Sequence, residues 1–273
     1  MDAVQLTTFQ AVIETGSFEA AARVLRVTPS AVSQRIKALE SSVGQVLVRR
    51  TKPCVATPAG EPLVRFAGQV ALLEREALDQ ARDGTRISLV VNADSLHTWF
   101  LPALAAVPGP AYELHTDDQD YTADLLRAGT AMAGVTAQNV VVQGCRLEKL
   151  GAMRYLAVGP PGADPTTSPM IVYNRKDALQ HRFLALVTRR PVDPPIHYVP
   201  AAGAHVEAIR LGMGWGVVPE QVALLDIEAG RYQRLLPDRH LDVPLYWQYW
   251  RIGSSMLGTL TDAVKAAAAA ALR

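Results

Sequence analysis

The stretch Ser17–Gly44, SFEAAARVLRVTPSAVSQRIKALESSVG, decides how the N-terminal part of this chain folds. Ser17 and Thr28 are suitable helix N-cap residues, and Pro29 follows Thr28 at the first helical position, where proline is favoured. Gly44 is a typical residue for the end of a helix. The stretch therefore predicts two helices that are joined by a tight turn.

The helix that starts at Pro29 has two chemically different faces. One face is apolar and consists of Val32, Ile36, Leu39 and Val43. The other carries short donors, an amide and a cation, on Ser30, Ser33, Gln34 and Lys37. Two short helices of which the second exposes such a face are typical of a DNA-binding helix-turn-helix. Gln34 can make a bidentate contact with adenine, whereas Arg35 and Lys37 suit phosphates.

The flanking residues extend this unit on both sides. An apolar repeat at helical spacing predicts an earlier helix that ends at Thr15-Gly16, with Leu6, Phe9, Val12 and Ile13 on its inner face. Two short predicted strands, Val46–Val48 and Pro53–Ala56, enclose a basic tip that resembles a wing. An ordinary three-helix packing unit is the alternative. We expect DNA contacts from Pro29, Ser30, Ser33, Gln34, Arg35, Lys37, Arg49, Arg50 and Lys52.

Composition and charge narrow the class of protein. The chain has 273 residues, of which 49% are hydrophobic, and a net charge of +1, which excludes a disordered chain and favours about two domains. Residues 23–65 hold eight basic residues against two acidic ones, which indicates an anionic partner such as DNA. A solvated positive face is the alternative.

Cellular location follows from three further features. The chain has two cysteines, which fits a reducing compartment. It opens without a basic segment of the kind that begins a secretory signal, and it has no apolar run of about 18 residues, the length of a spanning helix. We therefore expect a cytoplasmic protein with no membrane contact.

A long helix is predicted from Thr57-Pro58 to about Arg82, because no proline occurs between Pro62 and Pro102. Apolar residues at heptad spacing form a seam along it, which predicts pairing with a second copy. Packing of the helix on its own domain is the alternative. The seam consists of Leu63, Phe66, Val70, Leu73 and Ala77.

The rest of the chain alternates strands and helices, which predicts an α/β domain with mainly parallel strands. A proline- and glycine-rich break at Gly159–Pro165 predicts a crossing between two lobes. The predicted strands are Ile87–Val91, Tyr112–His115, Met132–Thr136, Met153–Val158, Met170–Tyr173, Ile196–Val199, Gly216–Val218 and Leu245–Trp250. The predicted helices begin near Ser95, Thr122, Gly203 and Ser254.

The N-terminal residues resemble the winged helix-turn-helix of LysR-type transcriptional regulators over about sixty contiguous residues. The matching motifs are Leu6/Phe9, Gly16-Ser17-Phe18, Ala21-Ala22, Leu25, Ala31–Ile36, Leu39-Glu40, Gly44 and Thr57–Gly60. The resemblance implies a multi-domain chain: a winged helix-turn-helix over 1–58, a dimerising linker helix over 59–84 and a two-lobed effector domain over 85–273. This effector domain is similar to periplasmic binding proteins. Lobe I would cover about 85–159 and 251–273, and lobe II about 160–250.

Further motifs resemble the arginine- and lysine-export branch of that family (the ArgP/LysG branch). They are Asn92–Leu96, Thr98-Trp99, Leu101–Leu104, Gly44–Val48, Leu126-Arg127, Gly134-Val135, Cys145, Lys149–Ala152 and Tyr246-Trp247. The resemblance implies a homodimer or homotetramer that binds double-stranded DNA, works with RNA polymerase and senses lysine or arginine. It implies no cofactor and no metal ion.

A basic amino acid needs N–H donors for its carboxylate and acidic groups for its cations. The turn Ala93–Leu96 starts a helix directly after a strand, a favourable place for a carboxylate. Asp117, Asp118 and Asp177 follow predicted strands, so they are candidates to bind the cationic groups of the ligand. As an alternative, each of these acids, and Asp94, could be a helix cap or a solvated loop residue. The expected effector residues are Asn92, Ala93, Asp94, Ser95, Leu96, Asp117, Asp118, Thr136, Asp177, Ala201 and Ala202.

Three other functions are considered, of which two are alternatives and the third is disfavoured. Relatives in the export branch usually carry serine near Ala201-Ala202, so a LysR-type regulator with a different effector is one alternative. An architectural or replication-associated DNA-binding protein is another, although DNA bending alone needs no ligand cleft. An enzyme is disfavoured, because the six histidines show no metal-ligand spacing and no nucleophile motif is visible.

Overall fold

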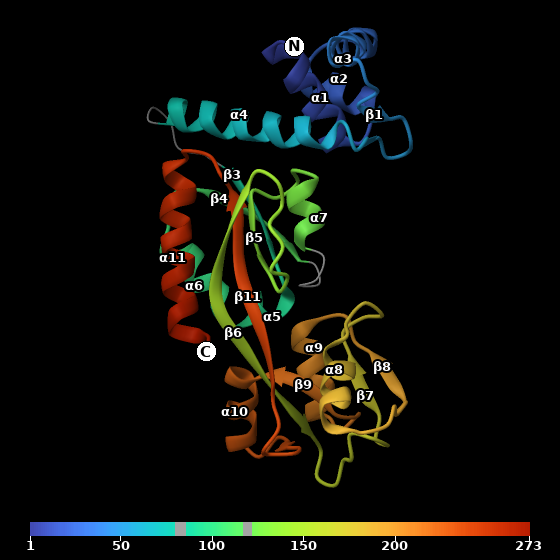
Figure 1. The fold of residues 1–273 in the computed structure, drawn as a ribbon, viewed down its shortest axis with the longest axis vertical. Helices are drawn as coiled ribbons and strands as arrows, with labels where there is room; N and C mark the ends of the chain where they lie inside the picture. Colours follow the sequence, from blue (N-terminus) through green and yellow to red (C-terminus); the bar gives the residue numbers. More distant parts are fainter. Residues whose placement is uncertain (80–85, 117–121) are drawn as a thin grey trace.

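The computed structural model describes residues 1–79, 86–116 and 122–273. A small helical domain lies at one end, and helix α4 (Glu61–Asp79) lies between it and the two lobes of the larger domain (Figure 1). Lobe I contains the elements between Arg86 and Thr136 and the C-terminal helix α11 (Ser255–Ala271), and lobe II contains the elements between Met170 and Arg234. Among the described residues, no helix is long and apolar enough to cross a membrane.

The three predicted N-terminal helices are confirmed. They are α1 (Ala3–Thr15), α2 (Phe18–Leu25) and α3 (Pro29–Val43). The Ser17 hydroxyl accepts the Ala20 N–H at 3.0 Å and the Thr28 hydroxyl accepts the Ala31 N–H at 3.2 Å, as expected of N-caps. Gly16 and Gly44 end α1 and α3 with φ of 69° and 76°, in the left-handed region that glycine tolerates.

The core of this domain follows the predicted apolar face of α3, with one exception. Val32, Ile36 and Leu39 are fully buried, together with Phe9 of α1. Val43 was expected on the same face but is 39% exposed. It is the last residue of α3 and is not part of the apolar core of this domain, so the apolar pattern extends about one turn beyond the core.

The wing is confirmed, although its strands are shorter than predicted. Strands β1 (Val48–Arg49) and β2 (Val55–Ala56) form an antiparallel pair. The Glu40 carboxylate on α3 accepts the N–H of Leu47 at 2.9 Å and of Val48 at 3.3 Å. These bonds hold the start of the wing against α3.

Helix α4 begins at Glu61 rather than at Pro58. Residues 58–60 form a turn in which the Gly60 N–H donates to the Thr57 hydroxyl at 3.1 Å, so the proline starts the turn and not the helix. One side of α4 packs on lobe I. A Cβ atom at Gly68 would lie 2.7 Å from the Trp250 ring, and Arg65 donates to the Arg127 carbonyl at 2.5 Å.

The predicted seam lies on the less buried side of α4. Phe66 and Leu73 are 43% and 42% exposed, and Leu63 and Val70 are half-buried. The side chain of Ala77 lies outside the described residues. Four seam residues are therefore accessible to a second chain, and pairing through them stays a prediction.

The larger domain is built on a seven-stranded sheet, and only β3, β4 and β5 pair in parallel. All other pairs in this sheet are antiparallel. The prediction of mainly parallel strands was therefore wrong, because the sheet is dominated by two long antiparallel strands. The strands, in sheet order, are β10 (Gln233–Arg234), β6 (Cys145–Gly159), β11 (Leu241–Trp250), β5 (Ala133–Thr136), β3 (Arg86–Val91) and β4 (Ala111–Thr116), with β9 (Gly216–Pro219) also on β6.

The chain passes between the lobes inside β6 and β11. These strands pair from Cys145 with Trp250 to Tyr155 with Leu241, and both run from lobe I into lobe II (Figure 1). The predicted crossing at Gly159–Pro165 instead lies beyond the lobe II end of β6. The cluster of prolines and glycines marks the loop after the strand. The crossing strands contain only isolated breakers, Gly151 in β6 and Pro244 in β11, which lie close together within the paired ladder.

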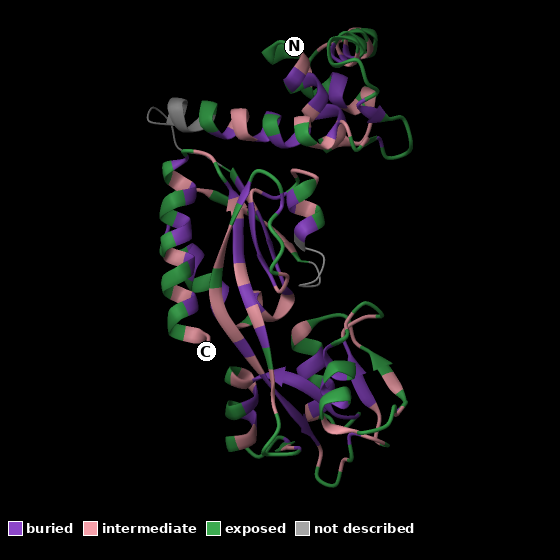
Figure 2. Ribbon diagram, viewed as in Figure 1, coloured by how far each residue is buried: buried purple, intermediate pink, exposed green. Residues whose placement is uncertain are grey.

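The smaller elements complete both lobes. Figure 2 shows buried residues concentrated in the central strands of lobe I and in β7 and β9 of lobe II. Two helices of lobe II, α8 and α10, were not predicted. The remaining elements are α5 (Ala93–Ser95), a π-helical turn (Leu96–Phe100), α6 (Leu101–Ala105), α7 (Thr122–Arg127), β7 (Met170–Val172), α8 (Leu179–Val187), β8 (Ile196–Tyr198), α9 (Ala202–Arg210), α10 (Glu220–Glu228) and α11 (Ser255–Ala271).

Candidate functional site

The first turns of α3 carry most of the residues expected to contact DNA. Ser30, Gln34 and Lys37 are exposed, and Ser33 is half-buried. Arg35 is half-buried, and its guanidinium donates to the Thr8 hydroxyl at 3.4 Å. The exposed face of α3 thus presents hydroxyl, amide and ammonium groups, while Arg35 also contacts α1.

The wing supplies the remaining predicted residues, Arg49, Arg50 and Lys52, all of which are exposed. The Arg50 guanidinium lies 4.7 Å from the centre of the Phe18 ring, a cation–π contact that holds it beside α2. Two neighbouring elements therefore present basic and hydrogen-bonding groups, which is the chemistry that phosphates and base edges require.

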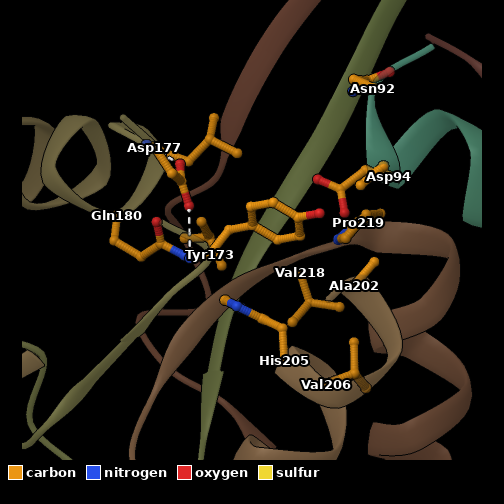
Figure 3. A pocket seen from close by; sticks show the side chains of 13 residues that line it. Asn92, Asp94, Tyr173, Asp177, Gln180, Ala202, His205, Val206, Val218 and Pro219 are labelled. Carbon is orange, nitrogen blue, oxygen red and sulfur yellow. Dashed lines mark hydrogen bonds between the residues drawn. The ribbon is translucent and has the colours of Figure 1, made fainter. Parts of the chain in front are cut away.

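A second candidate site is a pocket between the lobes, with about 570 Å³ of space including the part open to solvent. This volume is in the range of small-molecule sites. Its walls come from the start of α5, the β7–α8 connection, α9 and β9 (Figure 3). The lining residues are Asn92, Ala93, Asp94, Tyr173, Asp177, Leu179, Gln180, Ala202, His205, Val206, Val217, Val218 and Pro219.

The pocket collects five of the eleven residues expected to bind an effector: Asn92, Ala93, Asp94, Asp177 and Ala202. Four others, Ser95, Leu96, Thr136 and Ala201, are described but are not among its lining residues. Ser95 is fully buried, and the Thr136 hydroxyl accepts the Gln138 N–H at 3.1 Å. Asp117 and Asp118 lie outside the described residues.

Asp94 gives one wall of the pocket a negative charge. Its carboxylate points into the pocket and accepts the Tyr155 hydroxyl of β6 at 2.8 Å (Figure 3). The sequence suggested that the turn Ala93–Leu96 would receive a ligand carboxylate. A second carboxylate would be repelled by Asp94, so this wall is better suited to a cation.

Asp177 provides the second acid and also a structural role. Its carboxylate accepts the backbone N–H of Tyr173 at 3.1 Å and of Leu179 at 2.9 Å, which fixes the connection between β7 and α8. Within the part of the chain that the structure describes, the lining residues include two carboxylates and no lysine or arginine. Among the described residues, the formal charge of the walls therefore favours a cationic ligand.

Gln180 and His205 line the pocket but were not predicted. They are 1% and 7% exposed, and Gln180 Oε1 and His205 Nε2 have no hydrogen-bond partner within the described parts of the chain. Burial lowers the pKa of His205 to about 4, so its imidazole is neutral at pH 7. The apolar spacing of Leu179, Phe183 and Leu184 was the signal that could have revealed α8 and hence Gln180.

A buried ion-pair network positions α9, whose first turn borders the pocket. Arg210 at its end donates to the two Asp226 oxygens of α10 at 2.8 and 3.0 Å, and Arg231 donates at 2.5 Å. Burial raises the pKa of the Asp226 carboxyl, but the hydrogen bonds from both arginines outweigh it and leave that pKa below its ordinary value. Asp226 therefore stays ionised and joins α9 to α10.

The residues that the structure describes at the two candidate sites do not form a metal centre. Within residues 1–79, 86–116 and 122–273, no group of three histidine, cysteine, aspartate or glutamate side chains could hold a metal ion. The two cysteines are buried and unpaired by disulfides, and burial raises the pKa of Cys145 to about 11.

Family models match both parts of the chain. Residues 4–61 match the bacterial regulatory helix-turn-helix protein, lysR family, and residues 80–269 match the LysR substrate binding domain. The chain is 45% identical over 290 residues to the HTH-type transcriptional regulator LysG of Mycobacterium tuberculosis, and the match covers 100% of this chain and 95% of that protein.

Two solved structures have the same fold over the whole chain. The crystal structure of ArgP from M. tuberculosis has a TM-score of 0.92 at 45% identity, and the match covers 100% of this chain and 99% of that one. Full-length LysG from Corynebacterium glutamicum with bound effector Arg has a TM-score of 0.85 at 40% identity and 100% coverage of both chains. This chain belongs to the LysR family of bacterial helix-turn-helix transcriptional regulators.

Proposed function

We propose that this chain regulates transcription of an amino-acid exporter gene in response to a basic amino acid, lysine or arginine. The observation that carries the proposal is the pair of carboxylates, Asp94 and Asp177, in a pocket with no lysine or arginine among the described residues that line it. The similarity to LysG and ArgP proteins, one of them described with bound arginine, supports it.

The ligand carboxylate would bind at the start of α9. The first N–H groups of a helix have no partner within the helix and favour an anion. Ala201 makes no side-chain cap there, and Ala202 lines the pocket. The hydroxyl groups usual at these positions in the branch are therefore not needed for a carboxylate, because the backbone donors remain.

The two cations of the ligand would then bind the two acids. Figure 3 shows Asp94 on the same side of the pocket as Ala202, with Asp177 on the other side. The α-ammonium group would contact Asp94 and the side-chain cation would contact Asp177. In this orientation, one basic amino acid would neutralise the negative charges of both pocket walls.

At the other end of the molecule, the exposed face of α3 would enter the major groove. Gln34 would read a base, while Lys37 and the wing cations Arg49, Arg50 and Lys52 would contact phosphates. Pairing through Leu63, Phe66, Val70 and Leu73 would place two such helices on a two-fold site. A dimer or tetramer of this kind, in the cytoplasm and beside RNA polymerase, is the assembly that we propose.

The effect of ligand binding would reach the DNA-binding domains through β6 and β11, the two strands that connect the lobes and that we call the hinge. The ligand would contact both lobes, so it would bind more tightly when the lobes are close together than when they are apart. This difference in affinity would shift the protein towards the closed arrangement of the lobes. Strand β11 crosses between the lobes and ends at Trp250, whose ring packs on Gly68 of α4. A change at the hinge would therefore reach the linker helix and the spacing of the DNA-binding domains.

To test the proposed function, DNA fragments from the source genome are selected by binding to the immobilised protein. Each selected fragment is then placed upstream of a reporter gene. We expect fragments upstream of a transporter of the exporter class, and reporter output that changes with lysine or arginine. Asp94→Asn should abolish the response but retain the fragments, whereas the exposed Asp193→Asn, on the same lobe as Asp177, should change neither. A reporter that responds only to another metabolite would leave DNA regulation intact and refute the effector assignment.

A further inference from the structure

The carbonyl oxygen of Gln180 is a buried acceptor in need of a donor. The residue is 1% exposed, and Oε1 has no hydrogen-bond partner in the described part of the chain. An acceptor in this state is costly in free energy unless a water molecule or a ligand satisfies it. Since Gln180 lines the pocket, a bound ligand can bring the missing donor.

Gln180 lies beside one of the two pocket acids. Asp177 precedes α8 and Gln180 is its second residue, three positions later, so both side chains start from the same end of the helix. Figure 3 shows them on the same side of the pocket, opposite Asp94. The side-chain end of the ligand thus meets one charged and one neutral acceptor.

The two basic amino acids differ in how many donors they bring. A guanidinium group is planar and has five N–H donors in a fixed fork, whereas an ammonium group is compact and has three. A fork can donate to two neighbouring acceptors at once. An ammonium that binds the Asp177 carboxylate is more compact and is less able to reach Gln180 as well.

We propose that Gln180 makes the pocket prefer arginine over lysine, by accepting a guanidinium N–H on Oε1 while Asp177 accepts another. This assignment rests on the proposed function of the pocket. It makes Gln180 a specificity-determining residue, because an unmet buried acceptor penalises the ligand with fewer donors.

The experiment is calorimetric titration of the full chain with L-arginine and with L-lysine. The wild type should bind arginine more tightly. Gln180→Met, which keeps the length of the side chain and removes the acceptor, should reduce the ratio of the two affinities by about tenfold, mostly through weaker arginine binding. Gln180→Glu restores an acceptor and should recover the preference. Gln233→Met, at an exposed glutamine of β10, is the matched control and should leave the ratio unchanged.

Two results would overturn the inference alone: tighter binding of lysine than of arginine by the wild type, or equal weakening of both ligands by Gln180→Met. The first needs no variant, so the inference can fail even if Gln180→Met does not fold. A wild type that binds neither amino acid would instead overturn the proposed function, and the inference with it.

Discussion

The α3 surface and the pocket between the lobes are built in different ways. The α3 surface comes from one helix and its adjoining wing, and its shape is fixed by caps and by a core formed within residues 9–64. The pocket draws its walls from segments between Asn92 and Pro219, which only the folded sheet brings together. Local sequence is therefore sufficient to place the first site and insufficient to place the second.

The two regions also differ in what stabilises them. Thr28 stabilises α3 through one hydrogen bond, which its hydroxyl accepts from the Ala31 N–H in the first turn of the same helix. The wall formed by α9 depends on Asp226, which joins two helices and a loop through Arg210 and Arg231. Damage to the pocket scaffold should therefore cost more stability than damage to a cap, and the predictions below test this difference.

The largest expected effect is that of Asp226→Ala. Removal of the buried carboxylate leaves Arg210 and Arg231 without their acceptor, and breaking a buried ion pair costs about 3 kcal/mol at the lower end of the usual range. We choose the lower end because both arginines are partly exposed. Urea unfolding of the variant and the wild type measures the difference. Unchanged stability would show that the network does not hold α9.

Gln34→Ala tests the α3 surface without touching the pocket. If Gln34 reads a base, its loss should cost roughly 1–3 kcal/mol on a selected DNA site and relax specificity at one position. Arg50→Ala is the control, and it should weaken binding to all sequences similarly and reduce the dependence on salt. Fluorescence anisotropy with specific and random duplexes separates the two cases. Equal losses on both duplexes for Gln34→Ala would refute base readout.

The pH dependence of stability should report the buried His205. Its pKa is lowered to about 4 in the folded state, so the unfolded chain binds the proton more readily between pH 4 and about 6.5. Stability from this group is complete above pH 6.5 and is lost as the pH falls. Between pH 7 and pH 5 the loss should be about 2 kcal/mol. Chemical denaturation of His205→Asn at both pH values should show a smaller loss, and an identical loss would contradict the assignment.

The smallest expected effect is that of Thr28→Ala. It removes the N-cap hydroxyl of α3 and should cost about 1 kcal/mol of stability. The matched change Thr7→Ala, at an exposed threonine inside α1, should cost less because no cap is lost. Thermal unfolding compares the two variants. If Thr28→Ala lowered the free energy of unfolding as much as Asp226→Ala does, the two regions would not differ in how they are stabilised.

Much of the fold could be read from local residues. Ser17, Thr28 and Gly44 fixed the helix ends, and β3, β4, α7 and α11 lie within about two residues of their expected positions. The direction of strand pairing could not be read in this way. Apolar strands look alike in parallel and antiparallel sheets, and the pairing of β6 with β11 joins residues 86 (Tyr155 with Leu241) to 105 (Cys145 with Trp250) positions apart.

The pocket was predicted only in part, because its walls come from segments that are far apart in the sequence. Asp177 was predicted because acids that follow strands tend to face ligand sites. Asp94 was predicted only as part of the turn Ala93–Leu96, which was expected to hold a ligand carboxylate. Gln180 and His205 were missed because each is an ordinary polar residue in its own segment. Only their burial beside the same pocket, without hydrogen-bond partners for Gln180 Oε1 and His205 Nε2 among the described residues, makes them candidates for ligand contact.

The most direct test of the central claim is the melting temperature of the purified chain with each of the twenty amino acids. A ligand at about 100 times its dissociation constant adds roughly 2.7 kcal/mol, which raises the melting temperature by a few degrees. We expect such a rise with arginine and lysine, and its loss in Asp94→Asn. A rise with other amino acids but not with these two, or an undiminished rise in Asp94→Asn, would contradict the account of the pocket.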